Sequence, residues 1–258
     1  MEIEELNKSA KQMVAKGKGI LAADESEKTV GKRFASVNLE NVEDNRRAFR
    51  EMLLTAPGEG EYISGVILHD ETIRQSLADG RLFVQILQSE GILPGIKVDL
   101  GLTPMSEGSA EQLTKGLDGL GDRLKEYEGL GAKFCKWRSV TTIGEGMPTE
   151  ANIRQNAKDL AAYALVCQQH GLVPIVEPEV LLEGRHSMAQ AKEATAKILS
   201  ALFEALEQAG VAAEGVILKS SMVLPGKNFG TKATPEEVAK ETLEVFKQTL
   251  PSNLAGEV

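Results

Sequence analysis

The chain has few cysteines, no long apolar run and fewer basic than acidic residues, and each of these features excludes a class of protein. Only two cysteines, Cys135 and Cys167, occur in 258 residues, so a disulfide framework is excluded and a reducing compartment is the simpler interpretation. No run approaches the roughly 18 consecutive apolar residues that a membrane span needs. Basic residues are outnumbered 29 to 38 by acidic ones, and the net charge of −9 argues against nucleic acid or an anionic membrane as a partner.

Histidine is equally scarce, which bears on metal binding. The three histidines are His69, His170 and His186. His170 precedes Gly171 at the end of a helical pattern, where a capping role is the default. Only His69, beside Asp70 at a predicted strand end, lies where a metal ligand could be, and a single histidine is weak support for a divalent site. We expect no metal and no other cofactor.

The amino-terminal segment carries no targeting signal that the sequence reveals. Residues 1–18 form a mixed-charge helical pattern without the apolar core of a secretory signal, and they contain too many acids for a transit peptide. We therefore expect a cytoplasmic protein.

Six short apolar runs alternate with longer amphipathic stretches. Each run is nearly continuous in apolarity, as strands buried on both faces are. The runs are residues 19–24, 63–68, 92–98, 134–140, 172–176 and 215–218. The clearest helical patterns between and after them are residues 151–170, 186–209 and 235–249, the last with Thr234 as N-cap and Pro235 at its first position.

This alternation predicts an α/β fold with a parallel sheet and right-handed crossovers. A doubly wound dinucleotide-binding sheet would have a glycine-rich fingerprint after its first strand, but Ala23 is followed by Asp-Glu-Ser-Glu-Lys-Thr-Val-Gly. The sequence therefore favours a (β/α)8 TIM barrel, with residues 1–258 as a single domain.

Charged residues lie in or just after five of the six predicted strands. Residues two apart in a strand share a face, and charge in a low-dielectric interior must be paired or functional. One such residue could simply reach solvent, but five strands with both signs favour a site, because catalytic groups of barrels converge at the carboxyl ends of strands. The residues are Asp24, Lys97, Asp99, Lys136, Arg138, Glu177, Glu179 and Lys219.

The cations in this set indicate an anionic substrate. Lys97, Lys136, Arg138 and Lys219 concentrate positive charge within an acidic protein, which suits a phosphorylated metabolite. Neighbouring cations and burial would lower the pKa of Lys219 and make its amine nucleophilic towards a carbonyl. Cys135 and Cys167 have no partner at a metal-binding or redox spacing, so both are predicted to pack in the core.

Several ordered motifs resemble those of class I fructose-1,6-bisphosphate aldolase. They are GILAADES (19–26), NRR (45–47), GIKVD (95–99), GLDGL (116–120), KWR (136–138), VPIVEPE (173–179) and LK (218–219). The resemblance implies a (β/α)8 barrel lyase of glycolysis and gluconeogenesis. It further implies reversible cleavage of fructose 1,6-bisphosphate to dihydroxyacetone phosphate and glyceraldehyde 3-phosphate, through a Schiff base and without metal. The family is commonly homotetrameric, so a homo-oligomer is expected.

The resemblance also implies roles for catalytic residues. Lys219 would form the Schiff base, and Glu177 would move the proton that dehydrates the carbinolamine, with Glu179 polarising the network. Lys136 would protonate intermediates and hold down the pKa of Lys219. Asp24 would deprotonate or orient the C4 hydroxyl as the C3–C4 bond breaks.

Phosphate binding is implied for a second group of residues. By the same resemblance, one phosphate would be held by Lys97, Arg138, Ser26, Thr29 and Arg33.

The carboxyl-terminal end departs from the family pattern. Six strands are predicted, and Leu254–Val258 reads as the opening of another strand. We therefore expect a C-terminally truncated barrel that lacks strands seven and eight, leaves the first and sixth strands exposed, and has reduced or absent activity on the bisphosphate.

Two other functions remain open at this point. One is a Schiff-base aldolase for another sugar phosphate. The other is an inactive aldolase fragment that acts as a binding or scaffold protein through its exposed sheet edges.

Overall fold

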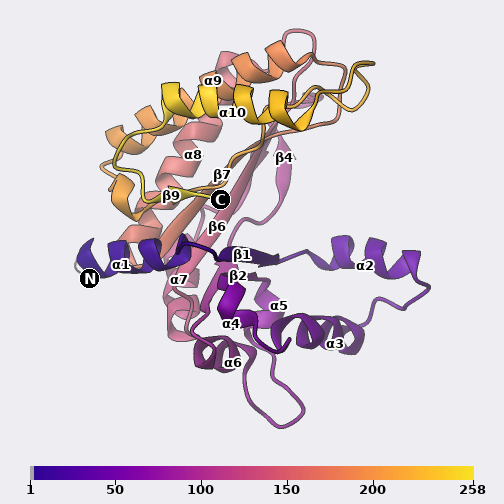
Figure 1. The fold of residues 1–258 in the computed structure, drawn as a ribbon, viewed down its shortest axis with the longest axis vertical. Helices are drawn as coiled ribbons and strands as arrows, with labels where there is room; N and C mark the ends of the chain where they lie inside the picture. The colour runs from indigo at the N-terminus through magenta and orange to yellow at the C-terminus, as the bar shows by residue number, and fades with distance from the viewer. Residues whose placement is uncertain (1–2) are drawn as a thin grey trace.

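A parallel sheet forms the centre of the computed structural model, which describes residues 3–258 (Figure 1). The strand order is β1-β2-β3-β6-β7-β8-β9, and each neighbouring pair is parallel. These strands are β1 (Gly19–Ala23), β2 (Ile63–Leu68), β3 (Leu93–Lys97), β6 (Phe134–Thr141), β7 (Val173–Val180), β8 (Ile217–Leu218) and β9 (Gly256–Glu257). A separate antiparallel hairpin pairs β4 (Leu102–Pro104) with β5 (Gln112–Thr114).

Helices connect the strands, and several of them cover the outer face of the sheet. They are α1 (Ile3–Met13), α2 (Glu27–Ser36), α3 (Glu43–Leu54), α4 (Glu59–Tyr62), α5 (Asp70–Ile73), α6 (Phe83–Ser89), α7 (Leu120–Gly129), α8 (Glu150–Gln169), α9 (Met188–Gln208) and α10 (Pro235–Thr249), with one 3-10 turn, η1 (Ala213–Gly215). Figure 1 shows α8, α9 and α10 stacked beside β6 and β7, whereas α2 and α3 extend away from the other end of the sheet. Within residues 3–258, none of the helices combines the length and the hydropathy that crossing a membrane requires.

The predicted α/β class and the parallel sheet are confirmed, and the predicted helix at 235–249 has the expected bounds. Its start is fixed by Thr234, whose hydroxyl accepts a hydrogen bond from the Glu237 amide at 3.2 Å. This bond satisfies one of the free amides of the first turn.

The opening of another strand predicted at Leu254–Val258 is confirmed, and the prediction that strand seven is missing is wrong. Gly256 and Glu257 form β9, which pairs with Ile217 and Leu218 of β8, and the Val258 amide donates to the Leu218 carbonyl at 2.9 Å. Strand seven therefore begins within the chain, and the edge strands of this sheet are β1 and β9, not the first and sixth. A two-residue strand is too short for its hydrophobic pattern to define its extent.

The sheet curls so that it has an inner and an outer core. The outer core lies between the strands and the helices. The inner core combines one face of α1 with inward-facing strand residues; its members are Leu6, Ala10, Met13, Ile67, Phe134, Val173, Ile175 and Ile217. Since side chains two residues apart share a face, Glu177 and Lys219 follow Ile175 and Ile217 on this inner surface. The apolar layer and α1 thus close one end, and the charged residues occupy the other.

Phe134 fills the space between two strands that carry glycine where they face it. A Cβ at Gly95 would lie 2.2 Å from Phe134 ring carbons, and a Cβ at Gly65 would lie 2.9 Å from the same ring. Neither distance is possible without displacing the ring, which is itself fully buried. These glycines are therefore required by the close approach of an aromatic side chain.

We expect Gly95→Ala to lower the free energy of unfolding by about 1–3 kcal/mol, because the added methyl overpacks the inner core. Urea unfolding of the purified chain measures the change. Gly129→Ala is the matched control, since a Cβ there meets nothing within 4 Å. Equal unfolding midpoints for Gly95→Ala and the unsubstituted chain would show that Phe134 does not set this constraint.

Candidate active site

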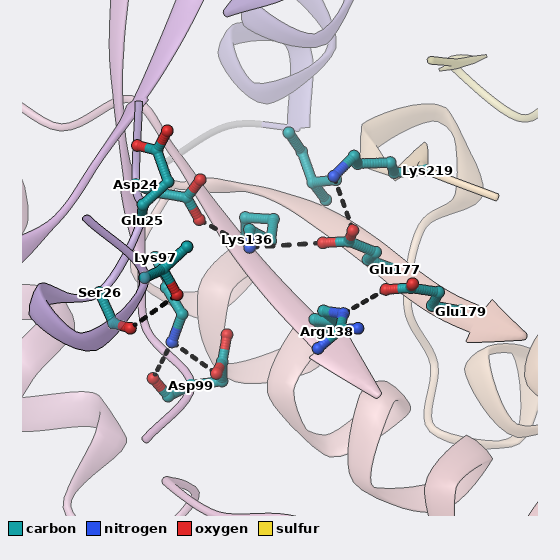
Figure 2. Close-up of polar contacts among 12 residues, drawn as sticks. Asp24, Glu25, Ser26, Lys97, Asp99, Lys136, Arg138, Glu177, Glu179 and Lys219 are labelled. Atoms are coloured by element: carbon teal, nitrogen blue, oxygen red, sulfur yellow. Dashed lines mark hydrogen bonds and ion pairs between the residues drawn. The ribbon is translucent and has the colours of Figure 1, made fainter. Parts of the chain in front are cut away.

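The register of the sheet brings the charged strand residues onto one inner surface. Lys97 of β3 pairs with Lys136 of β6, and Arg138 pairs with Glu177 of β7. Lys219 follows β8 directly, and its amide donates to the Val176 carbonyl at 2.9 Å. Because paired residues of a sheet point to the same side, these side chains converge (Figure 2).

Four of them form a chain of alternating charge across the site. Lys219 Nζ lies 2.6 Å from Glu177 Oε1. The other oxygen of Glu177, Oε2, lies 3.4 Å from Lys136 Nζ, which in turn lies 2.7 Å from Asp24 Oδ2. Figure 2 shows this sequence of contacts running from the end of β8 to the end of β1. Two cations and two carboxylates are thus interleaved.

Burial divides the chain of charges into a fixed part and an accessible part. The side chains of Lys136, Asp24 and Glu177 are only 6%, 10% and 10% exposed. The Lys219 side chain is 34% exposed and lines a cleft of about 410 Å³ together with Glu177, Glu179, Ser220 and Ser221. The amine of Lys219 can therefore meet a ligand, whereas Lys136 acts from behind the carboxylates.

The buried position of Lys136 changes its pKa in two opposing ways. Burial lowers the pKa of Lys136, but the nearby Asp24 and Glu177 carboxylates more than offset this, and the pKa is raised above its ordinary value of 10.5. Lys136 is therefore a permanent cation near neutral pH. Glu177 Oε2 faces it at ion-pair distance without a hydrogen bond, so this oxygen keeps a free lone pair.

The remaining predicted residues of the strands form two separate ion pairs. Lys97 Nζ contacts Asp99 Oδ1 at 2.5 Å and the Asp99 carbonyl at 2.6 Å, as expected for residues on one face. Arg138 binds Glu179, and although burial lowers the pKa of Arg138, this carboxylate raises it overall. Within the described residues, the ion pair of Glu179 is therefore with Arg138, and Glu179 does not contact Glu177.

Ser26, Thr29 and Arg33 lie at the junction of β1 and α2. Ser26 is the N-cap residue of α2, and its hydroxyl lies 3.1 Å from that of Thr29. Arg33 is 57% exposed and binds Glu25. These three residues thus lie at the edge of the site next to Asp24. They do not directly contact the row of alternating charges formed by Lys219, Glu177, Lys136 and Asp24.

Sequence reasoning missed residues that hold the site from outside it. Arg50 of α3 is 3% exposed and binds Glu25. Ser221 Oγ accepts from the Val180 amide at 3.0 Å and so ties the segment after Lys219 to β7. Arg123 of α7 donates to the Val98 carbonyl at 2.9 Å, at the end of β3. Each lies outside the strand patterns, so periodicity gave no signal for them.

No cluster of three or more histidine, cysteine or acidic side chains within residues 3–258 is arranged to hold a metal ion. His69 precedes α5, and burial, followed by the charge of Lys97, lowers its pKa. His170 is the C-cap of α8, as predicted. Cys135 and Cys167 are both buried, in agreement with the predicted core positions.

The chain is similar to known proteins over nearly its whole length. A family model for class I fructose-bisphosphate aldolases matches residues 5–258. A probable fructose-bisphosphate aldolase class 1 from Xanthomonas axonopodis is 52% identical over 99% of this chain and 77% of its own length. The cytosolic fructose-bisphosphate aldolase 4 of Arabidopsis thaliana is 50% identical over 96% of this chain and 63% of its own length.

A solved structure gives the same result for the fold. The fructose-bisphosphate aldolase of Plasmodium falciparum, crystallised with TRAP and a small-molecule inhibitor, superposes with a TM-score of 0.96 at 45% identity, over 99% of this chain and 74% of that one. The curled parallel sheet thus matches part of an aldolase barrel. This chain belongs to the class I fructose-bisphosphate aldolase family, a family of lyases.

We expect Lys136→Met to lower the free energy of unfolding by about 3–5 kcal/mol at pH 7, because the buried Asp24 would lose its cation and Glu177 would keep only Lys219. Since the pKa of Lys136 is raised in the folded state, its stabilising effect is fully present below about pH 10.5 and is lost as the pH rises through the folded-state value. The difference between the two proteins should therefore narrow above pH 10.5.

Urea unfolding between pH 7 and pH 11.5 measures this difference. Lys240→Met is the control, because that side chain is 70% exposed and should contribute almost nothing. A difference that stays constant through this pH range would contradict the proposed balance of charges.

Proposed function

We propose that this chain carries out the lysine Schiff-base chemistry of a class I fructose-bisphosphate aldolase in glycolysis and gluconeogenesis. The reaction is the reversible cleavage of fructose 1,6-bisphosphate to dihydroxyacetone phosphate and glyceraldehyde 3-phosphate. The observation that carries the proposal is the contact of 2.6 Å between Lys219 Nζ and Glu177 Oε1 within a chain of alternating charges. Membership of the family supports it independently.

The first half of the reaction forms an iminium at Lys219. The neutral amine attacks the C2 carbonyl carbon of the ketose, and the resulting carbinolamine loses its hydroxyl as water. Glu177 is placed to take a proton from Lys219 and to give one to the leaving hydroxyl, since it contacts Nζ directly. Lys136, 3.4 Å from the other oxygen of Glu177, holds this carboxyl group in position during these two transfers.

The second half breaks the C3–C4 bond. Asp24 takes the proton of the C4 hydroxyl, the carbonyl of glyceraldehyde 3-phosphate forms, and the electron pair of the broken bond moves into the iminium to give an enamine. Protonation at C3 and addition of water then release dihydroxyacetone phosphate and restore the amine. Asp24 is suited to this step because Lys136, at 2.7 Å, holds its carboxyl group in position.

Phosphate binding is assigned to the cations at the edge of the site. Lys97, Arg138 and Arg33 are each paired with a carboxylate in the free protein. Ser26 and Thr29 add hydroxyl donors at the amino-terminal end of α2, where the helix dipole favours an anion. A phosphate group would share or displace these carboxylate partners.

The wider arrangement is part of the same proposal. Residues 1–258 would form one domain of a (β/α)8 barrel, with Glu179 orienting Arg138 at the rim of the site. Three relatives from Arabidopsis thaliana carry the description cytosolic, which supports a cytoplasmic location. A homo-oligomer without a cofactor is part of the same proposal.

Borohydride trapping tests the chemistry. Incubation with dihydroxyacetone phosphate and sodium borohydride should add one covalent adduct at Lys219, detected by peptide mass spectrometry, with and without EDTA. Glu177→Gln should slow adduct formation by roughly 10²–10⁴-fold, because the proton transfers at Nζ lose their acid and base.

Lys227→Arg provides the control for this experiment. Lys227 is an exposed lysine paired with Glu183, outside the site, so trapping should be unchanged. An adduct that forms equally well on Lys219→Arg would overturn the proposal. Turnover of a non-phosphorylated or differently phosphorylated ketose in preference to fructose 1,6-bisphosphate would point to a different sugar phosphate. No adduct at all would favour a binding protein.

A further inference from the structure

The carboxylate of Glu25 is shared between two arginines. Glu25 lies between Asp24, after β1, and Ser26, the N-cap of α2. Arg50 Nη1 donates to Glu25 Oε2 at 2.5 Å, and Arg33 donates to the other oxygen, Oε1. The Glu25 side chain is only 12% exposed, so its charge needs a partner within the protein.

The two arginines differ in how firmly they are held. Arg50 is 3% exposed, and it makes a second bond to the Glu25 carbonyl at 3.1 Å. Its guanidinium also lies 5.3 Å from the centre of the Phe49 ring. Arg33, on α2, is 57% exposed, and within the described residues its ion pair is with Glu25. Arg33 can therefore turn to a ligand, whereas Arg50 cannot.

We propose that Arg50 is a positioning residue that neutralises Glu25 in every state of the site and so releases Arg33 to bind a substrate phosphate. The inference rests on the proposed function, in which Arg33 is a phosphate ligand. When Arg33 turns to the phosphate, Glu25 keeps the two hydrogen bonds from Arg50. The cost of leaving a buried carboxylate without a cation is thereby avoided.

Removal of Arg50 would reverse this relation. Glu25 would then have Arg33 as its remaining cation among the contacts described, and a phosphate would have to compete with a carboxylate for the same guanidinium. The effect on phosphate binding would arise without any contact between Arg50 and the ligand, since Arg50 is buried behind Glu25.

A set of variants tests the proposal through the affinity for inorganic phosphate, measured by isothermal titration calorimetry. Arg50→Gln should weaken binding by roughly fivefold or more, the range expected for a coupling between sites. Glu25→Gln combined with Arg50→Gln should restore the affinity to within about twofold of that of Glu25→Gln alone, because Arg50 acts through the Glu25 charge. In an Arg33→Gln background, Arg50→Gln should cause no further loss.

Arg47→Gln is the matched control, since Arg47 lies on the same helix and forms a partly exposed pair with Glu51, within one helical turn. Its phosphate affinity should equal that of the unsubstituted chain. If Arg50→Gln alone fails to fold, as seen by circular dichroism, the comparison of the double variant with Glu25→Gln carries the test, and unequal affinities overturn the inference. An equal loss in the presence and absence of Arg33 would also overturn it, because that result indicates a general effect of charge or structure.

Trapping at Lys219 separates this inference from the proposed function. Normal trapping of dihydroxyacetone phosphate together with no effect of Arg50→Gln on phosphate affinity would overturn the inference alone. Absence of trapping together with the expected series of phosphate affinities would overturn the aldolase chemistry alone.

Discussion

The whole site depends on one buried cation between two carboxylates. Lys136 is 6% exposed and contacts both Asp24 and Glu177, so its charge offsets the cost of burying two carboxyl groups that come from different parts of the sheet. Without that charge, Asp24 would be buried with no cation beside it, and Glu177 would keep only Lys219. The apolar inner core below and the accessible Lys219 above are arranged around this contact.

Much of the fold follows from pattern. Strands buried on both faces are continuous in apolarity, and this distinguishes the stretches before Asp24, Glu177 and Lys219 from the helices between them. The start of α10 was equally predictable, because Thr234 and Pro235 are local signals that act within one helical turn. The three-residue strands β4 and β5 were not, because elements so short carry too little pattern, whereas the segment that forms β9 was expected to open a strand.

The candidate site was predictable to a different extent. Charge within apolar strands indicated its residues, and the two-residue period correctly suggested that Lys97 and Asp99 share a face. Contacts between strands could not be predicted in the same way. The pairing of Glu179 with Arg138, for example, depends on the register of β6 and β7. The pair formed by Arg50 and Glu25 joins α3 to the end of β1, and no local pattern announces an arginine that is buried by tertiary packing.

Phe134 also limits the directions from which a ligand can reach the site. Its ring fills the gap left by Gly65 and Gly95, and α1 covers the same end of the curled sheet with Leu6, Ala10 and Met13. Within the described residues, side chains therefore fill this end of the curled sheet. A sugar phosphate reaches Lys219 from the opposite end, where the charged residues lie, or past the sheet edges at β1 and β9.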